Sequence, residues 1–224
     1  MTIQKVMVIG AGQMGSGIAQ VCAQAGFDVK LNDMKQEFFE RGLGVITKNL
    51  SRDVEKGRKT EEEKQAILSR ITMSLKLQDA ADVDIVIEAA VENMEIKQSI
   101  FKQLDEIAPK HAILATNTSS LPITEIGAVT KRPQQVIGMH FMNPVPVMKL
   151  VEIIRGLATA DEVYKAVEEM TRKLDKTPVE VNDFPGFVSN RILLPMINEA
   201  IYTLSEGVAT TEAIDDVMKL GMNH

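Results

Sequence analysis

The side chains best suited to proton transfer in this chain are a histidine and a glutamate on two neighbouring apolar segments. His140 lies within the run 136–141, and Glu152 lies within the run 149–154. The segment between these runs is too short for a helical crossover, so the runs are predicted to pair as antiparallel strands. A turn centred near Pro146 would place His140 opposite Glu152. An imidazole held by a carboxylate is an arrangement typical of a general base near neutral pH.

The other two histidines are interpreted as inert. His111 follows Pro109 in a turn of surface character, and His224 is the last residue of the sequence. A histidine within an apolar strand more often has a structural role than a catalytic one. The catalytic interpretation of His140 therefore requires a redox cofactor and a substrate hydroxyl beside the same strand, because oxidation of an alcohol needs a base for the hydroxyl proton.

A glycine loop near the N-terminus predicts such a cofactor. Residues 5–9 form an apolar run of strand character, the glycine loop (residues 10–15) follows at once, and a helical pattern continues to Gly26. In a βαβ unit these glycines permit the tight turn, the approach of a diphosphate to the backbone and close helix packing. The diphosphate would lie on the N–H groups at the start of the helix. The loop residues expected to contact a dinucleotide are Gly10, Gly12, Gln13, Met14 and Gly15.

The acid that ends the second strand-like run indicates which dinucleotide binds. The carboxylate of Asp33 is predicted to accept hydrogen bonds from the adenosine ribose, and it would repel the 2′-phosphate of NADP. NAD is therefore the expected cofactor, and Lys35 is near enough to leave NADP as an alternative. The competing interpretation is a glycine-rich turn in another kind of α/β protein, and Asp33 argues against it.

Three neutral side chains are candidates for holding a substrate beside His140. Ser119 could simply cap a helix, and Asn143 could form a turn before Pro144. Asn190 lies one turn into a predicted helix, where propensity gives no reason for a polar residue. Together the three are predicted to bind the substrate oxygen and the carboxamide of a nicotinamide.

A group of basic residues lies on the polar stretch that follows Asp33. One interpretation of this group is a solvated helix face. The other is a binding surface for the phosphates of a large acyl carrier. Its members are Lys48, Arg52, Lys56, Arg58 and Lys59.

Strand-like and helix-like runs alternate along the chain, which is typical of a parallel sheet covered by helices. Ligands of open α/β sheets collect at the carboxyl ends of strands. Gly10, Asp33, Glu92 and Ser119 all follow such ends. The prediction is a Rossmann-type, doubly wound α/β fold whose mostly parallel sheet has a terminal antiparallel strand pair. Beyond that pair, the later strand-like runs are 71–75, 84–89, 112–117 and 178–181.

A second, all-helical domain is predicted after the final strand. Pro185 breaks that strand, and from Val188 onward the pattern is helical with a broad apolar face. Thr210 or Thr211 is the expected cap of its second helix. Two helices cannot bury such a face alone, so the domain is expected to be incomplete or to pair with another chain. The predicted domains are 1–185, with a helical arm at about 36–70, and 186–224.

Composition argues against several classes of protein. The 224 residues are 45% hydrophobic and 25% charged, as in an ordinary globular chain. A net charge of −6 argues against a nucleic-acid partner, and no apolar run reaches membrane-spanning length. The first apolar run is interpreted as a strand and not as a signal peptide, so a cytoplasmic location is expected. The single cysteine, Cys22, is interpreted as a core residue, and no metal site is expected.

Five motifs, in order and with matching spacing, resemble the 3-hydroxyacyl-CoA dehydrogenase family. Within that family the chain is most similar to the bacterial 3-hydroxybutyryl-CoA dehydrogenases. The resemblance extends over the whole sequence. The motifs are the glycine loop, Glu88-Ala89-Ala90-x-Glu92, Asn117-Thr118-Ser119-Ser120, His140-Phe141-Met142-Asn143-Pro144 with Leu150-Val151-Glu152, and Asp183-x-Pro185-Gly186-Phe187-x-x-Asn190-Arg191.

The resemblance implies a reaction and a set of site residues. The reaction is the reversible, NAD-dependent oxidation of a (3S)-3-hydroxyacyl-CoA, 3-hydroxybutyryl-CoA in particular, to the 3-oxoacyl-CoA. His140 and Glu152 would form the catalytic pair, with Ser119 and Asn190 contacting the substrate. The implied NAD contacts are Asp33, Ala90, Glu92, Lys97, Asn117, Ser119 and Asn143, and the implied contacts to the CoA phosphates are Arg52 and Lys56.

The resemblance also bears on the end of the chain and on rival functions. Family members continue beyond the position of His224 into helices that complete the substrate domain and form a dimer interface. A C-terminally truncated chain is therefore expected, with a homodimer as the state of the complete protein. A dehydrogenase of a free hydroxy acid or sugar acid is an alternative on the same fold. A non-catalytic dinucleotide-binding protein is another, and the His140–Glu152 pair argues against it.

Overall fold

The computed structural model describes residues 2–224 and divides into two compact units, Met1–Phe184 and Pro185–His224. The described part of the first unit contains a sheet of eight strands. Neighbouring strands are parallel, except that β6 and β7 run antiparallel. The predicted Rossmann-type fold with an antiparallel pair is confirmed, and β8 adds a further parallel strand outside that pair. In spatial order the strands are β3 (Ile71–Ser74), β2 (Asp28–Asn32), β1 (Lys5–Ile9), β4 (Ile85–Glu88), β5 (Ile113–Thr116), β6 (Val136–Phe141), β7 (Leu150–Arg155) and β8 (Thr177–Asn182).

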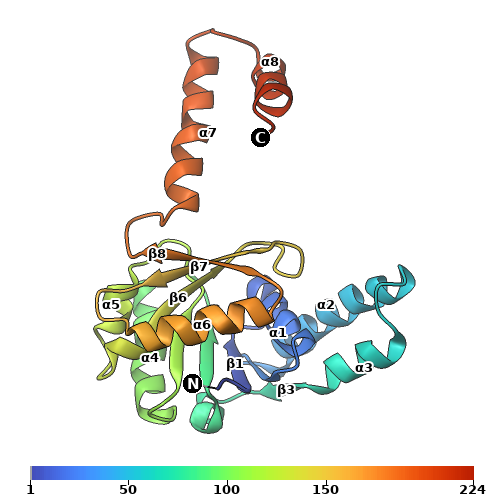
Figure 1. Cartoon of the computed structure of the whole chain (residues 1–224), viewed down its shortest axis with the longest axis vertical. Helices are drawn as coiled ribbons and strands as arrows, with labels where there is room; N and C mark the ends of the chain where they lie inside the picture. Colours follow the sequence, from blue (N-terminus) through green and yellow to red (C-terminus); the bar gives the residue numbers. More distant parts are fainter. Residues whose placement is uncertain (1) are drawn as a thin grey trace. The chain divides into compact units, whose positions relative to one another are not determined.

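Helices cover both faces of this sheet. One face packs into an apolar cluster with α1 (Gln13–Gln24), α2 (Gln36–Glu55) and α6 (Asp161–Lys173), and Figure 1 shows α6 lying across the sheet. The other face carries α5 (Ile123–Gly127), which contacts α4 (Met94–Ile107). Short 3-10 turns span Leu77–Asp82 and Pro133–Gln135.

The alternation of side chains along β6 decides which way its histidine points. Met139 and Phe141 belong to the apolar cluster beneath α1 and α6. Gly138 instead faces α5, because a Cβ at this position would lie 2.9 Å from Ile123 Cδ1. Successive strand residues point to opposite faces, so His140 shares the α5 face with Gly138.

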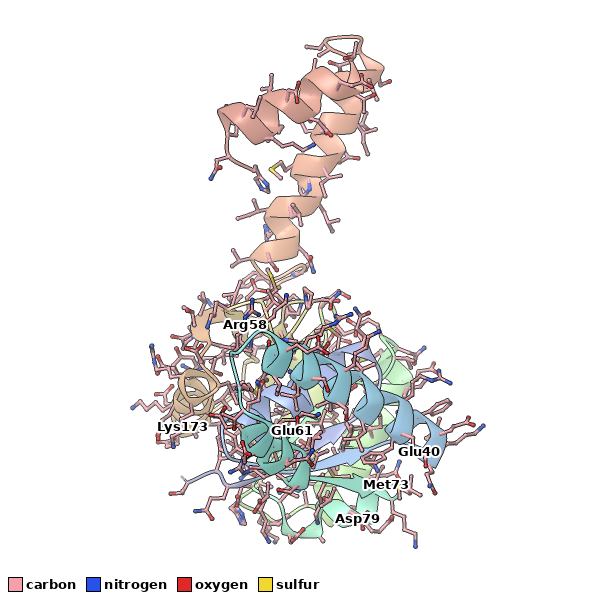
Figure 2. The ribbon with its side chains drawn as sticks, turned by 90° about the vertical axis from the view of Figure 1, so that its right-hand side faces the viewer. Glu40, Arg58, Glu61, Met73, Asp79 and Lys173 are labelled. Carbon is pink, nitrogen blue, oxygen red and sulfur yellow. The ribbon has the colours of Figure 1, made fainter. Side chains whose placement is uncertain are left out.

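The polar stretch after β2 forms two helices that extend from the sheet as an arm (Figure 1). The arm consists of α2 and α3 (Glu61–Ser69), and Figure 2 shows Glu40 and Arg58 towards opposite ends of α2. Ile46 and Leu50 bury the inner side of α2 in the apolar cluster. Thr60 begins α3 with a capping box, since its hydroxyl accepts from the Glu63 N–H and the Glu63 carboxylate accepts from the Thr60 N–H.

The second unit is entirely helical in its regular structure. It contains α7 (Ser189–Ser205), α8 (Thr211–Asp216) and one π-helical turn (Val217–Gly221). Thr210 caps α8, because its hydroxyl accepts from the Ala213 N–H. Apolar residues of α7 such as Ile192 are exposed. Among residues 2–224, no helix combines the length and the apolar character needed to cross a membrane.

Candidate functional site

The glycine loop contains two glycines that no other residue could replace without moving the backbone. Gly10 has φ +95°, and a Cβ there would lie 2.6 Å from the Ala89 carbonyl oxygen. A Cβ on Gly15 would lie 1.7 Å from the Gly10 carbonyl oxygen. A Cβ on Gly12 would meet nothing within 4 Å, so this glycine instead leaves space open before the first turn of α1. Open space at a helix N-terminus fits the diphosphate of a dinucleotide.

The Asp33 carboxylate is hydrogen-bonded to the same loop. One of its carboxylate oxygens accepts from the Ala11 N–H at 2.7 Å, and the other accepts from the Met34 N–H at 2.7 Å. The carboxylate is therefore held at the carboxyl end of β2, next to the glycine loop. A fixed acid at this point fits the ribose of NAD.

A second carboxylate joins the loops that follow β4 and β5. Glu92 accepts hydrogen bonds from the Thr118 hydroxyl and from the backbone N–H groups of Ser119 at 3.0 Å and Ser120 at 3.2 Å. Its other oxygen lies 3.5 Å from Lys97 Nζ. Burial acts to raise the pKa of Glu92, but these hydrogen bonds and the lysine charge outweigh it and hold the pKa below its ordinary value.

A buried ion pair lies at the carboxyl end of β4. Lys97 Nζ lies 2.7 Å from Glu88 Oε1, and both side chains are almost fully buried. The Glu88 carboxylate also accepts from the Ala90 N–H and the Thr116 hydroxyl, each at 2.7 Å. Glu88 thus joins β4, β5 and α4. Glu88 was not among the predicted site residues, although a charged residue at the end of an otherwise apolar strand is a signal for such a buried pair.

His140 and Glu152 are directly opposite each other in the antiparallel pair of β6 and β7. His140 Nδ1 lies 2.7 Å from Glu152 Oε2, and the two residues are 8% and 2% exposed. The register predicted from a turn near Pro146 is confirmed. A buried carboxylate at this distance fixes the orientation of an imidazole ring.

The β6–β7 loop (residues 142–149) brings this pair towards the glycine loop. Asn143 Oδ1 accepts from Gln13 Nε2, at the start of α1, at 3.1 Å. Asn117 Oδ1 accepts from the Phe141 N–H at 2.9 Å, which ties the end of β5 to the end of β6. The Asn143–Pro144 peptide bond is cis. Side chains from three separate segments therefore meet along one edge of the sheet.

The remaining predicted site residues lie on α1, at the end of α2 and on α7. Met14 is in the first turn of α1, and Asn190 is in the first turn of α7, in the second unit. Arg52 and Lys56 line a hollow of about 570 Å³, together with Pro144 and Pro146 of the β6–β7 loop. Its further lining residues include Gln20, Asn49, Arg58 and Lys59, and Lys48 is not among them.

The described residues contain no cluster of metal ligands, and Cys22 lies in the core. Among residues 2–224, no cluster of three or more histidines, cysteines or carboxylates could hold a metal ion. Cys22 is fully buried in the apolar cluster, as interpreted from its position on the helix. Burial raises the pKa of its thiol to about 12, which keeps it protonated near neutral pH.

Comparisons with known proteins extend over both units. Residues 5–184 match the NAD-binding domain of 3-hydroxyacyl-CoA dehydrogenase, and residues 186–224 match the C-terminal domain of that family. A probable 3-hydroxybutyryl-CoA dehydrogenase of Bacillus subtilis is 64% identical over 224 residues, which are 100% of this chain and 78% of the relative. A 3-hydroxyadipyl-CoA dehydrogenase of Escherichia coli is 43% identical, over 98% of this chain and 46% of that protein. The crystal structure of (S)-3-hydroxybutyryl-CoA dehydrogenase PaaH1 from Ralstonia eutropha superposes with a TM-score of 0.98 at 49% identity, covering 100% of this chain and 79% of that one.

Proposed function

The chain belongs to the 3-hydroxyacyl-CoA dehydrogenase family and is an NAD-dependent enzyme, and from this premise we propose its substrate and mechanism. The reaction is the reversible oxidation of (3S)-3-hydroxybutyryl-CoA to acetoacetyl-CoA. The observation that carries the proposal is the buried contact of 2.7 Å between His140 and Glu152. The names of the B. subtilis and R. eutropha relatives support the short acyl chain and the S configuration.

The dinucleotide is assigned to the edge of the sheet that carries the glycine loop. The start of α1 would hold the diphosphate, and Asp33 would hold the adenosine ribose. The remaining contacts are assigned to Ala90, Glu92, Lys97, Asn117, Ser119 and Asn143. When bound, NAD supplies the acceptor for the hydride that leaves C3 of the substrate.

His140 is assigned the role of general base. When the Nδ1–H group donates a hydrogen bond to Glu152, Nε2 is the ring nitrogen that accepts the proton of the 3-hydroxyl. The imidazolium that results is stabilised by the buried Glu152 carboxylate, and in the reverse direction it returns the proton. Ser119 is assigned a hydrogen bond to the substrate oxygen. The role of Asn190 stays a prediction from the family resemblance.

The CoA phosphates are assigned to the hollow between the arm and the β6–β7 loop. Arg52 and Lys56 line this hollow, and guanidinium and ammonium groups are the usual partners of phosphate. The test is the KM for acetoacetyl-CoA in Arg52→Met and in Lys56→Met. Each substitution should raise this KM by about tenfold, which corresponds to a loss of about 1.4 kcal/mol of binding free energy. The KM for NADH should stay unchanged. Lys48→Met is the matched control, because Lys48 is a basic residue of the same helix outside that hollow.

A longer acyl chain is a second candidate, because one relative is named for 3-hydroxyadipyl-CoA. The test is consumption of NADH by the purified chain with acetoacetyl-CoA, 3-oxoadipyl-CoA and free acetoacetate. We expect the highest kcat/KM with acetoacetyl-CoA. Equal reduction of free acetoacetate would contradict the CoA assignment and favour a dehydrogenase of free acids. A homodimer of the complete protein stays a prediction.

A further inference from the structure

A buried lysine outside the proposed catalytic set contacts the β6–β7 loop. Lys176 lies in the turn between α6 and β8 and is 7% exposed. Its Nζ donates to the carbonyl oxygens of Val145 at 2.6 Å and Met148 at 2.7 Å. Burial lowers the pKa of Lys176, since desolvation disfavours its charged form. A buried ammonium is tolerated where strong acceptors replace its water, and both of these acceptors belong to one loop.

That loop connects the parts of the proposed active site. Its ends continue into the strands that carry His140 and Glu152. Asn143, near its start, contacts Gln13 at the start of α1. Within the loop, the N–H groups of Val147 and Met148 both donate to the Pro144 carbonyl at 3.0 Å. Displacement of this loop would therefore move the catalytic pair relative to the cofactor helix.

A second contact holds the loop from the opposite side. Val145 is 2% exposed and packs against Gly17 on α1. A Cβ on Gly17 would lie 2.8 Å from Val145 Cβ and 3.1 Å from its Cγ2, so no larger residue fits while the loop keeps its place. The loop is thus fixed between α1 and the Lys176 ammonium.

We propose that Lys176 is a positioning residue for the dehydrogenase reaction, holding the β6–β7 loop by two backbone carbonyls so that His140, Glu152 and Asn143 keep their places beside the cofactor. The kinetic part of its test rests on the proposed function. The structural part does not, because the position of the loop can be measured without turnover.

The kinetic test compares Lys176 with Lys149, the last residue of the β6–β7 loop, whose side chain reaches Asp175 in the turn that contains Lys176. Lys176→Met keeps an unbranched apolar side chain that ends where the ammonium group of lysine begins, and so removes only the donor and its charge. The kcat should fall about 10- to 100-fold, as expected when the reacting groups are misplaced by up to about an ångström. The Kd for NADH should change by less than about threefold, because the glycine loop and Asp33 are untouched. Lys149→Met is the control, since Lys149 makes an exposed ion pair with Asp175 and should contribute little.

Two further measurements separate positioning from a purely structural role. Amide hydrogen exchange at Val147 and Met148 should become faster in Lys176→Met and remain unchanged in Lys149→Met. In Lys176→Ala, propylammonium should restore kcat, because Lys176 borders a hollow of about 270 Å³ that the amine can enter. Potassium at the same ionic strength should not restore it.

The outcomes decide the proposal in each case. Lys176→Met with kcat per folded enzyme within twofold of the wild type would overturn it, even if the variant unfolds at a lower temperature. If that variant does not fold, Gly17→Ala tests the same loop from the other side, and it should lower kcat while α1 gains helix propensity. A wild-type chain that does not reduce acetoacetyl-CoA contradicts the proposed function instead. In that case, unchanged exchange at Val147 and Met148 in Lys176→Met would still overturn the inference.

Discussion

The two sides of the proposed active site differ in whether backbone or side chains form them. On the β1–α1–β2 side, the site is mostly backbone: Gly10 and Gly15 have no room for a Cβ, and N–H groups lie at the start of α1. Asp33 is the side chain added to it. On the β6–β7 side, the site consists of side chains, with His140 and Glu152 held at 2.7 Å. A site formed by backbone depends on the absence of a Cβ at its glycines. A side-chain site depends on the neighbours that orient it, and Lys176 is one such neighbour far along the chain.

This difference predicts that mutations on the two sides will have separable effects. Changes on the glycine side should weaken cofactor binding and leave the chemistry of any bound cofactor intact. Changes on the histidine side should lower turnover and leave cofactor binding intact. The buried Glu88–Lys97 pair and Glu92 lie between the two sides, so their effects should be mixed and smaller.

The largest effect is expected for His140→Gln. Removal of the base should lower kcat by about 10² to 10⁴-fold, the usual contribution of a general base, while the Kd for NADH stays nearly constant. Stopped-flow turnover of acetoacetyl-CoA and fluorescence titration with NADH measure the two quantities. His111→Gln, at an exposed histidine, is the matched control and should retain turnover. Full activity in His140→Gln would remove this residue from the mechanism.

Gly15→Ala should have the opposite effect, weakening the binding of NADH and leaving the chemistry of the bound cofactor intact. Its Cβ would lie 1.7 Å from the Gly10 carbonyl oxygen, so the glycine loop must move away from the diphosphate position. We expect NADH to bind about 10²-fold more weakly, equivalent to a loss of about 3 kcal/mol. Gly44→Ala is the control, because Gly44 is a helical glycine of α2 with nothing within 4 Å of its Cβ. Equal NADH affinity in both variants would contradict the backbone account of this side.

Local patterns were sufficient to predict the fold and the register of the catalytic strands. The βαβ unit at the N-terminus and the alternation of strands and helices are short-range signals, and they led to the correct fold class. The pairing of His140 with Glu152 was predictable because a short loop between two strands leaves few registers. The functional assignments of these residues stay predictions.

Long-range contacts could not be predicted in the same way. Lys176 contacts a loop about 30 residues earlier, and in the sequence it is one lysine among many charged residues near α6. Glu88 contacts Lys97 and Thr116 across three elements. Such contacts depend on how the elements pack, which no period of two or of 3.6 residues encodes. The outermost position of β8 likewise follows from packing, since a single strand-like run carries no signal for its neighbours.

The smallest effect is expected for Glu92, which joins the loops after β4 and β5 between the two sides. Its pKa is lower in the folded chain than in the unfolded chain, so its stabilising contribution is complete above the ordinary pKa of a glutamate and is lost as pH falls through the lowered value. Glu92→Gln should therefore be less stable than the wild type near pH 6, by on the order of 0.5 kcal/mol for a partly exposed group. The two proteins should converge as the medium becomes more acidic. Urea unfolding midpoints at a series of pH values measure this difference. The control is Glu106→Gln, an exposed change on α4, the helix that begins just after Glu92. A difference in stability between wild type and Glu92→Gln that stays constant with pH would show that the charge of the carboxylate does not hold the β4 and β5 loops together, and that neutral hydrogen bonds alone connect them.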